Sequence, residues 1–260
     1  QVRCWGRTSK FPKGSLSEQM GDQAGEMENL SILELQTGVR AIAQGDSHFC
    51  WIDLFGQARC GGGTVSSGSL IGDANGNSPS SFAIMFSPGY GQLSDDVHAV
   101  AVSTTSSVSM VIFAQGKLRY FGDSSYKPPF PISMMDKMEE APVLRTVPYV
   151  NFGHTVPVVK ATGSNPSCVL FANGRINCWG IWANDSEDIN SQQFGMLPEL
   201  PLSKRQYLRL GPDDVLVKDI SLNTRGAHVC VITVADKVRC FGGSFSGGLG
   251  LENSQATVNA

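Results

Sequence analysis

The sequence predicts an all-β protein built from repeated antiparallel hairpins. Cysteines recur at a spacing of ten residues, in the pairs Cys50 and Cys60, Cys168 and Cys178, and Cys230 and Cys240. Met110 and Tyr120 hold the same two positions in a fourth copy. Glycine and proline, 29 and 13 of 260 residues, are spread along the chain, and no segment has a sustained helical period of apolar residues. We therefore expect strands and turns throughout, in a single domain over residues 1–260.

Each ten-residue interval predicts one hairpin, over residues 50–60, 110–120, 168–178 and 230–240. Six positions after each first residue stands a residue that tolerates positive φ, namely Gly56, Gly116, Gly174 or Asp236. Pairing Cys168 with Cys178 also pairs Phe171 with Arg175 and leaves a three-residue loop that ends in a left-handed residue. The two cysteines then form a non-hydrogen-bonded pair, whose side chains are close enough for a disulfide.

The hairpins belong to a longer repeat. Residues 2–6 match the second strand of a hairpin but have no first strand, so we treat them as an orphan strand. The second-strand positions are Cys4, Cys60, Tyr120, Cys178 and Cys240, which lie 56, 60, 58 and 62 residues apart. Periods of roughly sixty residues indicate a propeller or a solenoid. A short strand precedes each hairpin, beginning at Val39, Val97, Val156 and Val217. A short helix is expected near residues 31–36 or 133–140.

The repeat consists of a Val-x-x-Ile strand, a glycine turn, His-x-Cys, the hairpin, Cys-Trp-Gly and a Gly-x-Leu exit. It resembles the repeat of the regulator of chromosome condensation family of β-propellers over the whole chain. The resemblance implies four complete blades plus one extra strand. The cysteine pairs are more similar to the secreted and receptor-ectodomain branch, including the Crinkly-type plant receptors, than to the nuclear members. Because the family usually closes seven blades, the chain is either a fragment of a larger propeller or closes its ring otherwise.

Composition and cysteine use favour an extracellular protein. The net charge of −3 gives no general attraction to nucleic acid, and no apolar run is long enough for a transmembrane segment. The chain begins without a signal peptide, so a removed leader or a missing N-terminal portion is expected. Cysteine pairs at one repeated spacing predict disulfides. Zinc ribbons instead need two Cys-x-x-Cys motifs, which this sequence lacks. Cys4 is left unpaired or intermolecular. Asn29 and Asn184 each begin an Asn-x-Ser acceptor for N-glycans.

Alternation along each hairpin separates two faces. One face carries the paired cysteines, or Met110 and Tyr120, and is expected between blades. The other face carries a recurring cation, in the set Arg3, Arg59, Lys117, Arg119, Arg175, Lys237 and Arg239. These cations form either a basic interaction track for an anionic glycan or acidic partner, or charge that keeps the strands soluble and prevents edge pairing.

Catalysis is not expected. His48 and His228 each stand two residues before a hairpin cysteine, which indicates a repeated structural role, and His98 and His154 have no nearby ligand residues. The acidic clusters are typical of solvated loops, and no nucleophile elbow, phosphate loop or dinucleotide fingerprint is present. We expect no catalytic residue, no cofactor and no metal site.

The sequence therefore predicts an extracellular, disulfide-stabilised, N-glycosylated, non-catalytic scaffold. Its expected partners are proteins or copies of itself, with head-to-tail assembly into a multimer or filament, and it is expected to carry covalent N-glycans. One alternative is a soluble ligand-binding propeller that binds glycans or inhibits an enzyme. Another is an intracellular guanine-nucleotide exchange factor, as the resemblance to the nuclear members implies.

Overall fold

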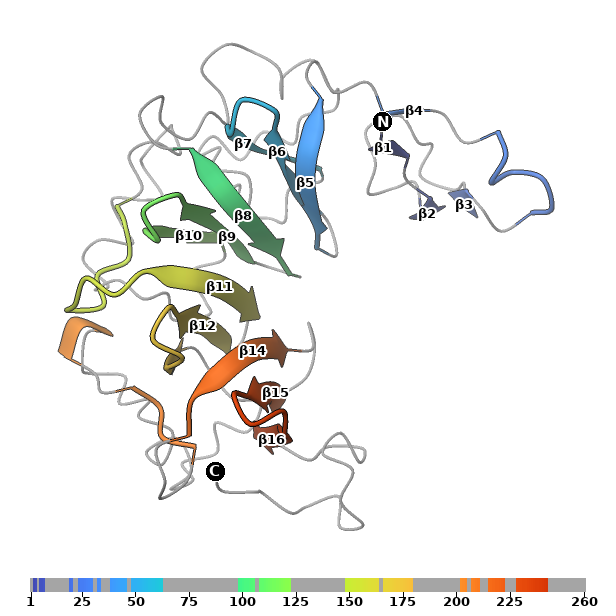
Figure 1. Cartoon of the computed structure of the whole chain (residues 1–260). Helices are drawn as coiled ribbons and strands as arrows, with labels where there is room; N and C mark the ends of the chain where they lie inside the picture. Colours follow the sequence, from blue (N-terminus) through green and yellow to red (C-terminus); the bar gives the residue numbers. More distant parts are fainter. Residues whose placement is uncertain are drawn as a thin grey trace, which may run out of the picture.

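Four three-stranded antiparallel sheets follow one another along a C-shaped arc (Figure 1). The structure, a computed structural model, describes residues 2–3, 5–7, 19–20, 23–29, 32–33, 38–45, 48–62, 98–105, 108–122, 148–163, 166–179, 202–204, 207–210, 215–222 and 228–242. Each sheet is one repeat of the sequence, and we number the sheets as blades 1 to 4 in chain order. The described residues form an all-β propeller arrangement with almost no helix.

The strands of each blade are consecutive in the chain. Blade 1 comprises β5 (Val39–Gln44), β6 (His48–Asp53) and β7 (Ala58–Gly62), and blade 2 comprises β8 (Ala99–Thr104), β9 (Val108–Phe113) and β10 (Leu118–Gly122). Blade 3 comprises β11 (Val158–Gly163), β12 (Ser167–Phe171) and β13 (Ile176–Trp179), and blade 4 comprises β14 (Val217–Leu222), β15 (His228–Thr233) and β16 (Val238–Gly242). A 3₁₀ turn covers Leu202–Lys204. The first strands lie side by side along the inside of the arc (Figure 1).

The predicted hairpin register is confirmed. Cys168 lies opposite Cys178, with their Cα atoms 4.1 Å apart, as a non-hydrogen-bonded pair requires. Phe171 closes the loop by donating its N–H to the carbonyl of Arg175 at 2.9 Å. Gly174 has φ of 78°, the left-handed conformation expected of the third loop residue. The same pairing places Tyr120 opposite Met110 in the hairpin without cysteines.

The first strand of every blade contains a β-bulge that the sequence did not predict. The register shifts between the first and third strand residues in all four blades. The second residue is therefore the extra one, and it is exposed each time, as Arg40, Val100, Val159 or Lys218. In blades 2 and 3 the strand also begins two residues later than expected, at Ala99 and Val158. The bulge therefore leaves one exposed side chain per blade on the first strand.

Short edge segments add to some third strands. Val150 donates its N–H to the carbonyl of Leu118, and Leu208 donates to that of Ile176. At the N-terminus, β1 (Val2–Arg3) pairs with β4 (Ile32–Leu33), and β2 (Gly6–Arg7) pairs with β3 (Gln19–Met20). The expected helix over 31–36 is wrong, because β4 pairs with the orphan strand in the way that these edge segments pair with their third strands. Residues 133–140 lie outside the described part of the chain.

The core consists of three apolar clusters, one between each pair of neighbouring blades. Cys50, Ile52 and Ala58 of blade 1 pack with residues of blade 2. Met110, Ile112, Leu118 and Tyr120 do the same between blades 2 and 3, and Cys168, Leu170, Ile176 and Cys178 between blades 3 and 4. The face that carries the cysteine positions is therefore the face between blades, as alternation predicted. Met110 and Tyr120 fill the same space without a crosslink.

Candidate interaction surfaces

The same backbone hydrogen bond joins the blades at three junctions. The first strand of each later blade, called the inner strand below, begins with a residue whose N–H donates to the carbonyl of the preceding blade's hairpin turn. The pairs are Ala99 to Gly56 at 2.7 Å, Val158 to Gly116 at 3.0 Å, and Val217 to Gly174 at 2.7 Å. The turn glycines have positive φ, and a Cβ on Gly116 would lie 2.3 Å from the Cβ of Pro157. Glycine is thus required both by conformation and by the close approach of the next blade. We call this hydrogen bond the blade lock.

Blade 4 presents an open half of this junction. Asp236 takes the turn position with φ of 60°, but among the described residues no inner strand follows to donate to its carbonyl. Val238 is 67% exposed, whereas its equivalents Ala58, Leu118 and Ile176 are at most 1% exposed. Every residue of β6, β9 and β12 is buried, but β15 alternates between buried and half-buried. The expected burial of this face is therefore wrong for blade 4, because no described blade packs on it.

Blade 1 presents the opposite side of such a junction, the side that elsewhere packs against a preceding blade. Ile42, on β5, is 46% exposed, whereas the equivalent Ala161 and Ile220 are 7% and 1% exposed because the preceding blade covers them. In the described ranges no hairpin turn precedes β5, so the N–H of Val39 has no blade lock. The face with Val238 on blade 4 and the face with Ile42 on blade 1 are called the end faces below.

Most of the predicted basic track is engaged by the protein itself. Arg59 lies with Nε 3.5 Å from the buried carboxylate of Asp53. The guanidinium of Arg119 is buried 4.6 Å from the ring centre of Tyr149, and this desolvation lowers its pKa. The guanidinium of Arg175 stacks on Tyr207, and that of Arg239 donates to the carbonyl of Leu210 at 2.7 Å.

The remaining track positions are more exposed. Arg3 lies exposed on β1 and Lys237 lies exposed at a hairpin, while the ammonium of Lys117 is 5.2 Å from the ring centre of Tyr149. Sequence reasoning missed Tyr149, which lies under Lys117 and Arg119, and Tyr207, which lies under Arg175. Their signal was present, since each stands 29 residues after its second-strand position (149−120 and 207−178). Cation–π contacts of this kind contribute about 0.5–2 kcal/mol each.

His154 lies in an aromatic cluster. Its ring centre is 4.7 Å from that of Phe171 and 5.1 Å from that of Tyr207. Burial against these rings lowers the pKa of His154, because the charged imidazolium loses hydration there. The N–H of Val156 donates to its Nδ1 at 3.3 Å, which also requires that nitrogen to be unprotonated. The cluster is a packing element between two edge segments and β12.

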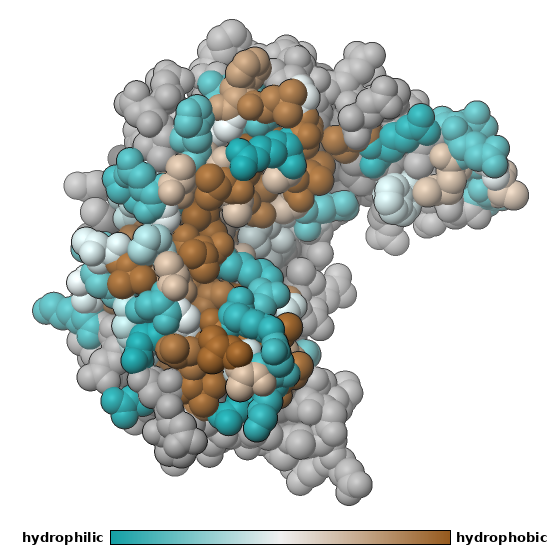
Figure 2. Space-filling model, viewed as in Figure 1, coloured by the Kyte–Doolittle hydropathy of each residue, from teal (hydrophilic) through white to brown (hydrophobic). Residues whose placement is uncertain are grey.

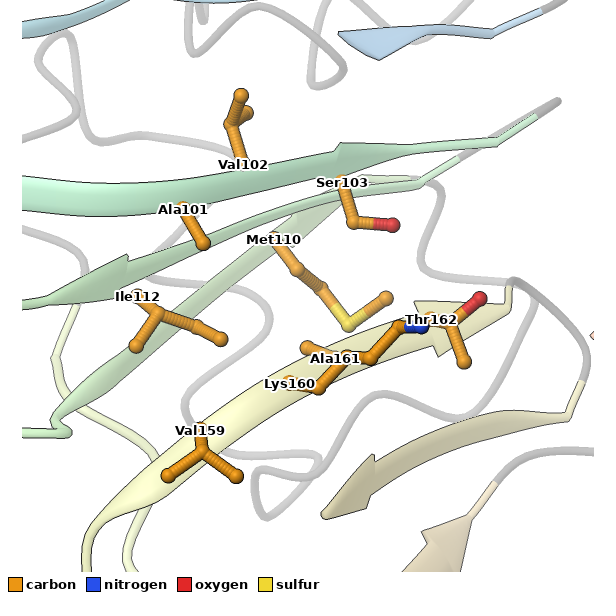
Figure 3. A pocket seen from close by; sticks show the side chains of 9 residues that line it. All are labelled: Ala101, Val102, Ser103, Met110, Ile112, Val159, Lys160, Ala161 and Thr162. Atoms are coloured by element: carbon orange, nitrogen blue, oxygen red, sulfur yellow. The ribbon is translucent and has the colours of Figure 1, made fainter. Parts of the chain in front are cut away.

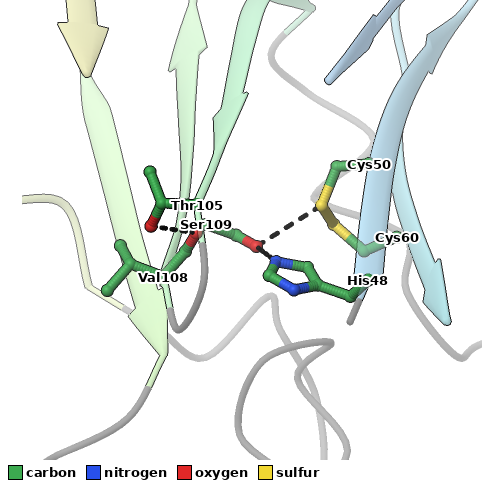
Figure 4. The surroundings of a disulfide bond; sticks show 6 residues. All are labelled: His48, Cys50, Cys60, Thr105, Val108 and Ser109. Carbon is green, nitrogen blue, oxygen red and sulfur yellow. Dashed lines mark hydrogen bonds between the residues drawn. A yellow bond between two sulfur atoms is a disulfide. The ribbon is translucent and has the colours of Figure 1, made fainter. Parts of the chain in front are cut away.

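His48 connects blade 1 to blade 2 beside a disulfide (Figure 4). Its Nε2 lies 2.7 Å from the hydroxyl oxygen of Ser109, which lies 3.5 Å from Sγ of Cys50. All three side chains are buried. A disulfide sulfur can only accept, so a relay from the imidazole N–H through the hydroxyl to the sulfur satisfies both contacts. His48 thus has a structural role, consistent with the repeated position that it occupies.

A pocket opens on the inside of the arc between blades 2 and 3. It has a volume of about 270 Å³ and is lined by Ala101, Val102, Ser103, Met110, Ile112, Val159, Lys160, Ala161 and Thr162. Figure 3 shows that most of these side chains face the space between β8 and β11. In the space-filling view an apolar band runs along the face that carries the first strands, from blade 1 to blade 4 (Figure 2). The exposed apolar residues Ile42, Val100 and Val159 belong to these strands.

The described residues contain no group of three His, Cys, Asp or Glu side chains that could hold a metal ion. No helix in the described part is long and apolar enough to cross a membrane. His48 and Ser109 are buried, and their contact with each other belongs to the packing between blades 1 and 2. What the described surface offers is contact area, in the end faces and the apolar band.

No protein-family model matches the chain, and no curated protein sequence matches it. Several solved structures match the chain. Human WBSCR16 matches with a TM-score of 0.58 and 18% identity, covering 94% of this chain and 54% of that one. Prp20p of Saccharomyces cerevisiae, the yeast RCC1, matches with a TM-score of 0.57 and 17% identity, covering 85% of this chain and 49% of that one.

The fold is that of an RCC1-type β-propeller. The chain spans about half the length of these two solved structures. The ectodomain of the Physcomitrella patens receptor kinase CR4 also matches, with a TM-score of 0.45, 17% identity and coverage of 80% of this chain and 42% of that one. At these identities the likeness describes the propeller alone.

Three predicted disulfides and one predicted glycan acceptor lie in the described part of this propeller. The structure joins all three predicted cysteine pairs as disulfides. Asn29 is exposed in a turn over residues 23–29, where its side-chain amide donates to the carbonyl of Gly25. Cys4 and Asn184 lie outside the described residues.

Proposed function

We propose that the chain is an extracellular, disulfide-stabilised, N-glycosylated scaffold without catalytic activity, which binds protein partners and copies of itself. The observation that carries the proposal is the open end face of blade 4. The residues equivalent to its apolar side chains are buried at the other three junctions. The carbonyl of its turn residue, Asp236, holds the position that accepts the blade lock at those junctions. A surface built like the first strand of a blade complements this end face in shape, polarity and hydrogen bonding. The end face of blade 1 is such a surface, which favours head-to-tail association of heterologous type.

Self-association can be tested on the end face directly. Val238→Asp places a carboxylate where apolar contact is expected, and we expect it to weaken association at least tenfold in sedimentation velocity. Val100→Asp is the matched control, since Val100 is 41% exposed on β8 of blade 2, which carries neither end face. A chain that stays monomeric, or that associates equally with and without Val238→Asp, contradicts this part of the proposal.

The disulfides and Asn29 support the extracellular location. Disulfides persist in oxidising compartments and are rare in the cytosol, and the exposed Asn29 side chain is accessible to a glycosyltransferase. Peptide mapping of the native protein under non-reducing conditions tests this location. We expect linked peptides for the pairs 50/60, 168/178 and 230/240, and a glycan mass on the peptide that contains Asn29.

One alternative function has an observation in its favour. Prp20p, studied for its binding to Gsp1p and histones, shares the propeller fold, which suggests an intracellular regulator. Three disulfides weigh against that function, since they would be reduced in the cytosol. Free thiols at these positions in the native protein would favour the regulator and contradict the extracellular scaffold. The glycan-binding alternative loses support because most of the basic track contacts the protein's own residues.

A further inference from the structure

The pocket between blades 2 and 3 exists because one inner-strand residue is small. The fourth residue of the first strand packs against the preceding blade, and at three junctions it is Val102, Ala161 or Ile220. Figure 3 shows Val102 directed away from the pocket, toward blade 1, while Ala161 faces Met110 and Ile112. Alanine leaves unfilled the volume that a branched side chain occupies at the neighbouring junctions. The floor of the pocket is therefore apolar, and its size exceeds that of a packing defect, which seldom holds more than a water.

The rim of this pocket is polar and cationic. The hydroxyls of Ser103 and Thr162 lie at its edge, together with Lys160. The ammonium of Lys160 is 2.5 Å from a carboxylate oxygen of Asp219, and its side chain remains 43% exposed. A lysine ammonium has three donors, so this ion pair leaves capacity for a second acceptor. The four first strands carry three cations, Arg40, Lys160 and Lys218; Lys160 pairs with Asp219, and Lys218 pairs with Asp236 of the hairpin turn.

Exposed apolar residues extend the pocket along the inside of the arc. Val159 and Val100, at the bulge positions of β11 and β8, are 50% and 41% exposed. They belong to the first strands, on the face along which the apolar band runs (Figure 2). A side chain entering the pocket would thus have apolar neighbours on both sides and a cation at the rim, as interface anchors commonly do.

We propose that this pocket binds one apolar side chain of a protein partner, flanked in the partner by acidic residues. The inference rests on the scaffold function proposed above and adds where a partner is anchored and by what chemistry. The apolar side chain fills the space beside Ala161, and a neighbouring carboxylate pairs with Lys160. The Lys160 ammonium at the rim, which keeps donor capacity beside Asp219, favours an acidic neighbour in the partner over a basic one.

Selection of peptides on the full-length chain tests the proposal. A random dodecapeptide display library is selected on the wild-type protein, with counter-selection on Ala161→Ile, which fills the pocket. We expect enriched peptides with one large apolar residue next to Asp or Glu. Their affinity by titration calorimetry should fall at least tenfold on Ala161→Ile and change little on Ile220→Leu, a substitution at the same strand position between blades 3 and 4, outside the pocket lining.

Two further measurements distinguish a filled pocket from an unfolded protein and from a purely electrostatic contact. Ala161→Ile should raise the thermal midpoint of the free protein, so loss of binding cannot be ascribed to unfolding. Lys160→Gln should weaken binding and reduce its dependence on salt. Peptides that bind Ala161→Ile as well as wild type overturn the pocket while leaving the scaffold function standing, and an empty selection overturns the pocket outright. The association test at Val238 is independent of either result.

Discussion

Single residues at the hairpin turns decide how closely neighbouring blades approach. Gly56, Gly116 and Gly174 combine positive φ with contact from the residue that precedes the next inner strand. Asp236 holds the same conformation where no described blade follows. The requirement for glycine is therefore partly conformational and partly steric, and the four positions allow these two causes to be separated.

Alanine substitutions should rank by the space around each turn. Gly174→Ala is expected to cost about 1–2 kcal/mol, mainly for the left-handed conformation, because its Cβ would lie 3.2 Å from Leu216, a contact that a small shift relieves. Gly116→Ala should cost more, since its Cβ would lie 2.3 Å from the Cβ of Pro157. Asp236→Gly should change the unfolding free energy by less than about 0.5 kcal/mol. Urea denaturation measures all three, and equal costs at Gly116 and Gly174 would contradict the steric account.

His154 should make stability depend on pH. Burial lowers its pKa in the folded state below the ordinary value of 6.5, so the unfolded chain binds the proton first. Its neutral form is retained above pH 6.5, and stability falls as pH decreases from there through the folded-state pKa. His154→Phe removes the titration while keeping an aromatic ring in the cluster. We expect a smaller loss of thermal midpoint between pH 7.5 and pH 5 in this variant, and parallel profiles would refute the assignment.

At the scale of the element, the hairpin is a stapled unit whose register was predictable. In an antiparallel hairpin the residue numbers of each facing pair add to the same value. Once Cys168 is placed opposite Cys178, Phe171 must therefore lie opposite Arg175, as observed. The bulge at the second residue of each first strand was not predictable, because no single residue type is common to its four positions, which hold Arg40, Val100, Val159 and Lys218. Burial of the second hairpin face was also missed, since Arg119 and Asn177 read as surface residues until neighbouring segments cover them.

Removing one disulfide should destabilise its hairpin without changing the fold. Cys168→Ala with Cys178→Ala opens a ten-residue loop, and we expect a loss of about 2–3 kcal/mol in unfolding free energy on the chain-entropy model. Blade 2 shows that the fold tolerates the absence of a crosslink, because Met110 and Tyr120 fill the space. Circular dichroism should therefore stay native while the denaturation midpoint falls. An unfolded double variant would contradict this view of the disulfide.

At the scale of the whole molecule, the four described blades form a stack of like surfaces whose first and last members have no described neighbouring blade. The period of roughly sixty residues predicted the number of blades, and the structure places them as one arc (Figure 1). The pocket beside Ala161 could not be predicted, because it depends on which strand position inserts between blades, and the unpredicted bulge sets that position. The end faces were likewise visible only once burial of Val238 and Ile42 could be compared with that of their equivalents.

The blade lock offers the most direct test of this architecture, by NMR amide hydrogen exchange on the full-length chain. Ala99, Val158 and Val217 donate to the preceding turn and should exchange slowly, with protection that approaches global stability. Val39, at the same position of blade 1 with no described turn before it, should exchange quickly and become protected when the end face is covered. Slow exchange at the three donors and fast exchange at Val39 is the predicted result. Equally fast exchange at all four amides would contradict the stacked-blade account.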